Sequence, residues 1–128
     1  MVSVLLDTNS VIAYLNGDAA VARKIELIPE LLLPAIVIGE MVYGAMESAH
    51  REDNLKLLKE FASVCEIVRC GDSAAYEYGR IKSKLEDKGR KIPENDIWIA
   101  ACAKNANLPL LSKDAHFDFV DDLQRVTW

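Results

Sequence analysis

The chain has 128 residues, of which 51% are hydrophobic and 27% are charged, and its 20 acidic and 15 basic side chains give a formal net charge of −5. That length is enough for one domain, residues 1–128, to bury its own core, and the composition is too apolar for a disordered protein. The acidic balance argues against a nonspecific nucleic-acid-binding protein, which usually has a basic surface.

The first half of the chain alternates apolar runs with helical patterns. Residues 2–6 are short and rich in Val and Leu, which predicts a strand buried on both faces. In chain order we expect a strand at 2–6, a helix that starts near Thr8 and ends at 15, a helix from 18 to about 27, a strand at 31–33 and a helix at 35–46.

The second half continues the same alternation. In chain order we expect a helix at 48–62, a strand at 64–68, a helix from 72 to about 88, a helix at 97–105, a strand at 108–111 and a short strand at 126–128. Asp72 is expected to cap its helix, Gly89 to end it, and Ala75 to lie on its inner face. Strands that alternate with helices predict a three-layer α/β/α domain with a mostly parallel central sheet of four to five strands.

Four carboxylates lie at the edges of these core elements. Asp7 ends the first strand, and Asp114 follows the strand at 108–111. Asp96 belongs to the first turn of its helix, and Glu40 to a helix face that it shares with apolar residues. Because ligands of open parallel sheets bind at the carboxyl ends of the strands, we expect the four side chains to meet at one edge of the sheet.

A cluster of buried carboxylates needs a cation to be tolerable. Carboxylates without His or Cys partners favour Mg²⁺ or Mn²⁺, ions that activate water and neutralise charge on a phosphoryl group. Asn9 and Ser112 are polar residues at the same sheet edge and are expected to support the site. Thr8 is expected to cap the first helix.

Each acid also has a simpler explanation. Asp7 could be a helix N-cap, and Asp96 a partner of the helix dipole. Glu40 is harder to explain in this way, although a salt bridge would do so. The acids near the carboxyl end of the chain read as solvated side chains, with Asp118 as a candidate fifth acid. His116 is an isolated histidine near Asp114, for which proton transfer is a minor alternative.

The basic residues, the cysteines and the apolar runs of the chain bear on its binding partners and its cellular compartment. Six basic residues between positions 80 and 91 indicate the wet face of an amphipathic helix more readily than an RNA-binding track. The three cysteines show no metal-type spacing and are expected to be reduced and largely packed in the interior. Without a membrane-length apolar run or a signal-peptide pattern, we expect a cytoplasmic protein with no membrane partner.

Four sequence segments, in this order, resemble the motifs of PIN-domain ribonucleases, and in particular of the VapC-type toxins of toxin–antitoxin pairs. The segment Leu5-Leu6-Asp7-Thr8-Asn9 resembles the first motif, and the Glu40 helix with Gly44 resembles the second. Residues 89–101, GRKIPENDIWIAA, closely match the third. Residues 110–117, LLSKDAHF, resemble the fourth, in which Thr is commoner than the Ser112 found here.

The resemblance implies a single PIN-like nuclease domain that hydrolyses RNA phosphodiesters with a water activated by Mg²⁺ or Mn²⁺. It makes Asp7, Glu40, Asp96 and Asp114 the metal-binding catalytic acids, with Asp118 left as another candidate for the fourth position. It also implies a homodimer that a cognate antitoxin protein holds inactive.

Two other functions compete with this hypothesis. The first is a stand-alone PIN endonuclease that processes RNA without an antitoxin. The second, more distant, is a haloacid-dehalogenase-like phosphatase, which also begins with an Asp at the end of a strand. That family has a second Asp two positions later, where this chain has Asn9.

Overall fold

A computed structural model describes residues 1–128, in which five parallel strands form one sheet in the order β3-β2-β1-β4-β5. The strands are β1 (Ser3–Leu6), β2 (Glu30–Pro34), β3 (Glu66–Val68), β4 (Leu110–Leu111) and β5 (Arg125–Val126). The helices are α1 (Thr8–Leu15), α2 (Ala19–Glu26), α3 (Ala35–Met46), α4 (Arg51–Ser63), α5 (Asp72–Asp87), α6 (Glu94–Ala106) and the 3-10 helix η1 (Ala115–Phe119). The predicted parallel α/β architecture with up to five strands is therefore confirmed.

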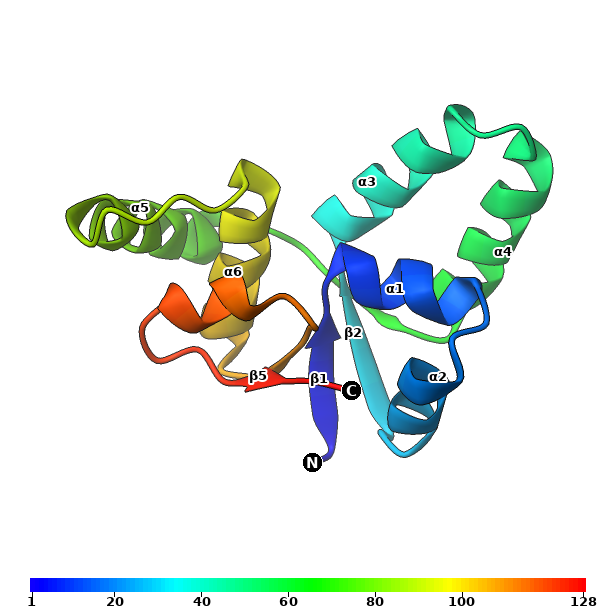
Figure 1. Cartoon of the computed structure of the whole chain (residues 1–128), viewed down its shortest axis with the longest axis horizontal. Helices are drawn as coiled ribbons and strands as arrows, with labels where there is room; N and C mark the ends of the chain where they lie inside the picture. The colour runs from blue at the N-terminus through cyan, green and yellow to red at the C-terminus, as the bar shows by residue number, and fades with distance from the viewer.

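Strand β1 lies at the centre of the sheet, between β2 and β4. Its residues Val4, Leu5 and Leu6 are fully buried, as expected for a central strand of a parallel sheet. Its carboxyl end leads into α1 at a point between two helical pairs, α3 with α4 on one side and α5 with α6 on the other (Figure 1). This arrangement leaves the carboxyl end of β1 at the base of the space between α3 and α6.

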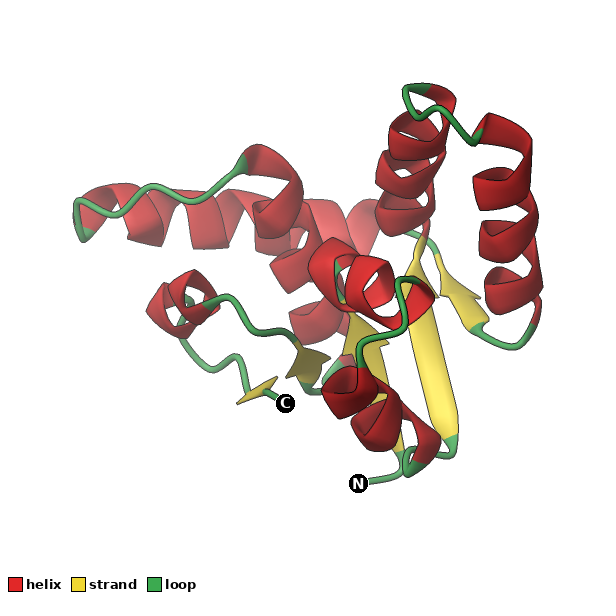
Figure 2. Ribbon diagram, turned by 45° about the vertical axis from the view of Figure 1, so that its right-hand side comes forward, coloured by secondary structure: helices red, strands yellow, loops and turns green.

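Helices pack on the sheet around a core of 25 buried residues (Figure 2). Helix α6 contributes more buried residues than any other helix: Ile97, Ile99, Ala100, Ala101, Cys102 and Ala103. Its alanines allow close packing, because a small side chain lets the backbone of the helix approach its neighbours. The most buried helix therefore carries Asp96 in its first turn, on a rigid support.

Two details of α5 differ from the predictions. Its N-cap is Gly71, whose backbone is extended, and Asp72 is already the first helical residue, so Asp72 is not the cap. Ala74 is buried whereas Ala75 is exposed, because the inner face of α5 follows the positions of the buried Ile81 and Leu85 at helical spacing. The predicted end is correct, since Gly89 follows the helix with a φ of +66°, which favours glycine.

Other boundaries shift by one to three residues. Helix α6 begins at Glu94 instead of 97, directly after Pro93, which is its N-cap. Helix α4 begins at Arg51 instead of 48. Strand β4 has two residues where four were expected, and β5 is Arg125–Val126 instead of 126–128. Both strands are limited to the two positions at which they pair with each other.

The burial of the cysteines and the length of the helices can be compared with the sequence predictions. All three thiols are free, with Cys102 buried and Cys65 and Cys70 half-buried, in line with the expected reduced interior residues. None of the helices combines the length and the apolar character needed to cross a bilayer.

Candidate active site

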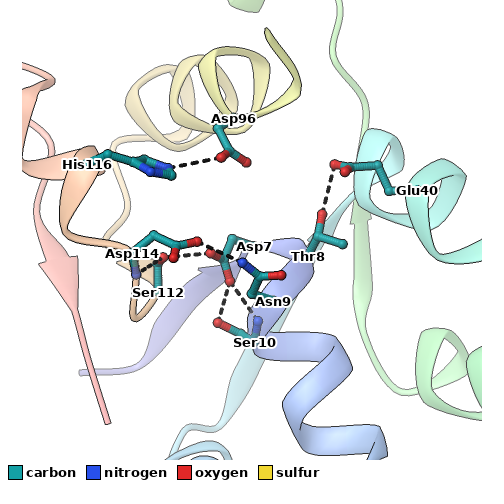
Figure 3. Close-up of polar contacts among 9 residues, drawn as sticks. All are labelled: Asp7, Thr8, Asn9, Ser10, Glu40, Asp96, Ser112, Asp114 and His116. Carbon is teal, nitrogen blue, oxygen red and sulfur yellow. Dashed lines mark hydrogen bonds and ion pairs between the residues drawn. The ribbon is translucent and has the colours of Figure 1, made fainter. Parts of the chain in front are cut away.

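Asp7 is 2% exposed and its carboxylate is held from two sides. It is the N-cap of α1, since Oδ1 accepts a hydrogen bond of 2.8 Å from the backbone N–H of Ser10. Oδ2 accepts a hydrogen bond of 2.6 Å from the hydroxyl of Ser112 (Figure 3). The capping explanation is therefore correct for Asp7, but one oxygen alone serves the cap, and the other faces β4.

Ser10 takes part in the site although no role was predicted for it, and Thr8 has a different role from the one expected. The Ser10 hydroxyl is buried 2.5 Å from Asp7 Oδ1 and 2.7 Å from the carbonyl oxygen of Leu111, so its single proton can satisfy one of the two at a time. Sequence reasoning missed Ser10, although a Ser three residues after an N-cap Asp was a usable signal. Thr8 does not cap α1; its hydroxyl instead donates a 2.9 Å hydrogen bond to Glu40 Oε1.

Asp96 and Asp114 meet at the same edge of the sheet and are joined there by His116. One ligand atom from each of these three residues lies within 4.8 Å of the other two. Nε2 of His116 lies 2.9 Å from Oδ2 of Asp96. The contact is an ion pair when the imidazole is protonated (Figure 3), but Nε2 has no hydrogen-bond partner.

Asn9 and Ser112 orient Asp114, as expected of supporting residues. The side-chain amide of Asn9 donates a 2.9 Å hydrogen bond to Oδ2 of Asp114. The hydroxyl of Ser112, which donates to Asp7, also accepts a 3.0 Å hydrogen bond from the backbone N–H of Asp114. A single serine therefore links two of the predicted acids across 107 residues of sequence, 7 to 114.

Glu40 lies on the opposite wall from Asp114 and His116 (Figure 3). It shares an open pocket of about 440 Å³ with Asp7 and Asp96. The prediction that Glu40 lies on a buried apolar face is wrong, because α3 buries Val37 and Ala45, while Tyr43 is 69% exposed. Glu40 is half-buried, and its position at the pocket, held by Thr8, follows from where α3 leaves β2.

Asp118 lies outside this cluster. Its two carboxylate oxygens each accept a 2.9 Å hydrogen bond from the guanidinium of Arg125, and its side chain is 54% exposed. Asp121 is paired in a similar way with Lys88 at 2.5 Å. The structure therefore brings Asp7, Glu40, Asp96 and Asp114 to one edge of the sheet and leaves Asp118 in a separate ion pair.

Electrostatics separate the clustered acids from ordinary surface carboxylates. Burial raises the pKa of Asp7 above its usual range, against the lowering effect of the hydrogen bonds from Ser10 and Ser112. Burial also raises the pKa of Asp96 to about 6; His116 opposes this rise, and the charges of the neighbouring carboxylates add to it. Like charges held together in a part-buried site are costly, and a cation would relieve that cost.

The donor set fits a hard divalent cation. Carboxylate oxygens are the ligands that Mg²⁺ and Mn²⁺ prefer, and no cationic side chain pairs with Asp7, Glu40 or Asp114 in the salt bridges of this chain. Nε2 of His116 points to the same conclusion, because it is a buried polar atom that contacts Asp96 without making a hydrogen bond. The donor set of the site therefore fits a divalent metal ion.

Comparison with known proteins agrees with this geometry. Residues 4–123 match the PIN domain family. Ribonuclease VapC2 of Haemophilus influenzae is 31% identical, over 100% of this chain and 99% of that protein. The tRNA(fMet)-specific endonuclease VapC of Shigella flexneri is 28% identical, over 100% and 99%.

Among solved structures, VapBC2 from Rickettsia felis bound to a DNA fragment from its promoter superposes with a TM-score of 0.93. It has 28% sequence identity, and the match covers 100% of this chain and 99% of that one. The similarity extends over the full length of both chains, so the whole fold is shared rather than one motif. The chain belongs to the PIN-domain family and, within it, to the VapC ribonucleases.

Proposed function

We propose that this protein is a metal-dependent endoribonuclease and the toxin of a toxin–antitoxin pair. The observation that carries the proposal is the group of buried and part-buried carboxylates without Lys or Arg partners at the carboxyl edge of a parallel sheet. Such a group is costly in a protein that has no use for it. Membership of the VapC ribonucleases narrows its use from phosphate chemistry in general to RNA.

In this proposal Asp7, Asp96 and Asp114 hold Mg²⁺ or Mn²⁺, and Glu40 completes the site from the opposite wall. When bound, such an ion supplies water activation and neutralises charge that develops on the phosphate. The chain supplies orientation: Ser10 and Ser112 fix the carboxylate of Asp7. Asn9 and Thr8 do the same for Asp114 and Glu40, which keeps the carboxylates in place as RNA enters.

The basic residues of α5 contribute little to an RNA-binding track in this proposal. Lys82 is paired with Glu94 at 2.6 Å, and Arg80 with Glu77 at 3.3 Å. Lys88 is paired with Asp121. Because four of the six basic residues between positions 80 and 91 are already paired with acids, we favour the solvent-exposed helix face over an RNA-binding track. We assign RNA recognition to the pocket around Asp7, Glu40 and Asp96.

The second part of the proposal is a protein partner. The similar structures from Rickettsia felis and from nontypeable Haemophilus influenzae are VapBC complexes, the latter with a TM-score of 0.87. Exposed apolar side chains on α3, among them Val42, Tyr43 and Met46, offer a contact surface for an antitoxin or a second copy. A small upstream gene that encodes a basic DNA-binding amino-terminal region would support this part of the proposal, and its absence would favour a stand-alone PIN endonuclease.

The experiment is an RNA cleavage assay with the purified protein on structured RNA, including initiator tRNA. Cleavage should need Mg²⁺ or Mn²⁺, stop with EDTA, and be lost in Asp7→Asn and Asp96→Asn. The matched control is Asp122→Asn, since Asp122 is exposed and has a φ of +60°, a conformation that Asn tolerates. Cleavage that survives chelation and both site substitutions would overturn the metal mechanism.

A further inference from the structure

We propose that His116 is a direct ligand of the cation, through Nε2, beside Asp96 and Asp114. This inference rests on the proposed function, because it assigns one more donor to the same metal site. The motif resemblance assigns metal binding only to carboxylates and gives this histidine no role.

The first argument is the contact between His116 and Asp96. Nε2 lies 2.9 Å from Oδ2, close enough for a hydrogen bond, yet no hydrogen bond forms between them. Two donor atoms at right angles around an ion with bonds of about 2.1 Å lie about 3.0 Å apart. The observed separation fits two neighbouring ligands of one cation as well as it fits an ion pair, and the absence of hydrogen-bond geometry favours the pair of ligands.

The second argument is the environment of Nε2. The atom is buried and has no hydrogen-bond partner, and its polar contact is the ion pair with Asp96. Asp114 belongs to the same cluster, in which one donor atom of each residue lies within 4.8 Å of the others. A metal ion held by the two carboxylates can use the lone pair of Nε2, since neutral imidazole is the form that binds metals.

The third argument is how His116 is held. It is the second residue of η1, and Asp114 is the N-cap of that short helix. Its ring packs at a tilt against the ring of Phe117, which is fully buried, with centroids 4.7 Å apart. One tight segment, anchored in the core, therefore presents a carboxylate and an imidazole to Asp96 together, as preorganised metal sites do.

The consequence is a change in metal preference. Carboxylates alone suit Mg²⁺, whereas an imidazole nitrogen favours transition metals. With His116 as a ligand, the site prefers Mn²⁺ to Mg²⁺ more strongly than the four carboxylates would. Of the two ions that the proposed function allows, Mn²⁺ is therefore the better fit to this site.

The test is electron spin-echo spectroscopy of the full chain loaded with Mn²⁺, which detects nitrogen bound directly to the ion. The wild-type protein should show imidazole ¹⁴N coupling. His116→Gln should lose it, and His50→Gln should keep it, because His50 is the only other histidine and lies at the start of α4. A melting curve of each variant shows that the fold is intact, and His116→Asn serves if His116→Gln fails to fold.

A second readout is the affinity of each ion, measured by competition. His116→Gln should weaken Mn²⁺ binding by at least about tenfold. That is the lower end of the loss seen when a residue that only supports a metal ligand is removed. Mg²⁺ binding should change less. If His116 merely orients Asp96, both ions lose affinity equally and the wild-type spectrum lacks nitrogen coupling, a result that overturns this inference and leaves the nuclease proposal standing. No cation binding, together with cleavage that resists EDTA, would instead overturn both.

Discussion

Two groups of aspartates lie close together in this fold and have opposite electrostatics. The inner acids, Asp7, Asp96 and Asp114, face one another, and burial raises the pKa of both Asp7 and Asp96. The outer acids, Asp118 and Asp121, are each paired with a basic side chain. Hydrogen bonds from Arg125 and Lys88 lower the pKa of these two carboxyl groups.

The difference between the groups lies in compensation. The outer acids have their counter-charges within the protein, so they are explained as structural ion pairs at the surface. The inner acids lack a basic Lys or Arg partner and sit where water is partly excluded, so their counter-charge has to come from a ligand. The most direct test of these roles is therefore to make the same Asp→Asn substitution in each group and to compare the effects.

The largest expected contrast is in activity. Asp114→Asn should reduce RNA cleavage by at least about 100-fold. Removing a residue that only supports a metal ligand costs roughly 10- to 100-fold, and loss of the ligand itself should cost more. Asp118→Asn should stay within about twofold of wild type, because its carboxylate is engaged with Arg125. Single-turnover cleavage rates of both variants measure the contrast. Equal losses would mean that Asp118 is part of the site.

The next contrast is in stability with metal present. A ligand at a hundredfold excess over its Kd stabilises a protein by about 2.7 kcal/mol. Saturating Mn²⁺ should therefore raise the Tm of the wild-type protein clearly, that of Asp118→Asn equally, and that of Asp96→Asn much less. Differential scanning fluorimetry across a Mn²⁺ titration gives all three curves. An unchanged wild-type Tm would contradict the assignment of the inner acids to a metal.

A smaller effect concerns pH in the absence of metal. Because the folded pKa of Asp96 is about 6, above its usual value of 3.8, the folded protein binds more protons than the unfolded chain between these values. The contribution of Asp96 to stability therefore falls as pH rises from about 4 to 6. In EDTA at pH 7, Asp96→Asn should melt a few degrees above wild type, since about 1 kcal/mol corresponds to roughly 3–6 °C in a protein of this size.

The outer acids should behave in the opposite way. Their lowered pKa values mean that their contribution is present above the usual Asp range and is lost as pH falls through the lowered folded values. Melting curves in EDTA from pH 3 to 7 should show the wild-type decline near pH 4 to 6 become clearly smaller in Asp96→Asn, where only Asp7 among the carboxyl groups keeps a raised pKa, and persist in Asp118→Asn. The same decline in both variants would show that Asp96 does not cause it.

The smallest effect is the stability of the outer ion pair itself. Asp118→Asn should cost about 0–1 kcal/mol at neutral pH, because the carboxylate is more than half exposed and solvent screens the pair. Urea unfolding at two salt concentrations would detect the difference. A loss well above that range would indicate that Arg125 needs Asp118 to reach the backbone of Ser112.

The sequence predicts much of this fold because local patterns and tertiary structure agree. The apolar run at 2–6 becomes the central strand, and Gly89 ends α5 as expected. The shared sheet edge of Asp7 and Asp114 follows from parallel topology, which places the ends of β1 and β4 side by side.

The remaining features depend on partners that are distant in sequence. The exposed face of α3, and hence the half-buried state of Glu40, is decided by how α3 packs on α4. The separation of Asp118 from the site depends on Arg125, which β5 brings next to β4. The contact of His116 with Asp96 joins η1 to α6 and leaves no trace in local periodicity.

The hydrogen bond from Nη1 of Arg125 to the carbonyl oxygen of Ser112 has a consequence for biosynthesis. Through the hydroxyl of Ser112, a strand translated late is connected to Asp7, which leaves the ribosome early. A nascent chain that ends before Ser112 can form the contact of Asp7 with Ser10 but not the one with Ser112. The full set of contacts around Asp7 is therefore completed only by the last part of the chain, where Arg125 holds the backbone of Ser112.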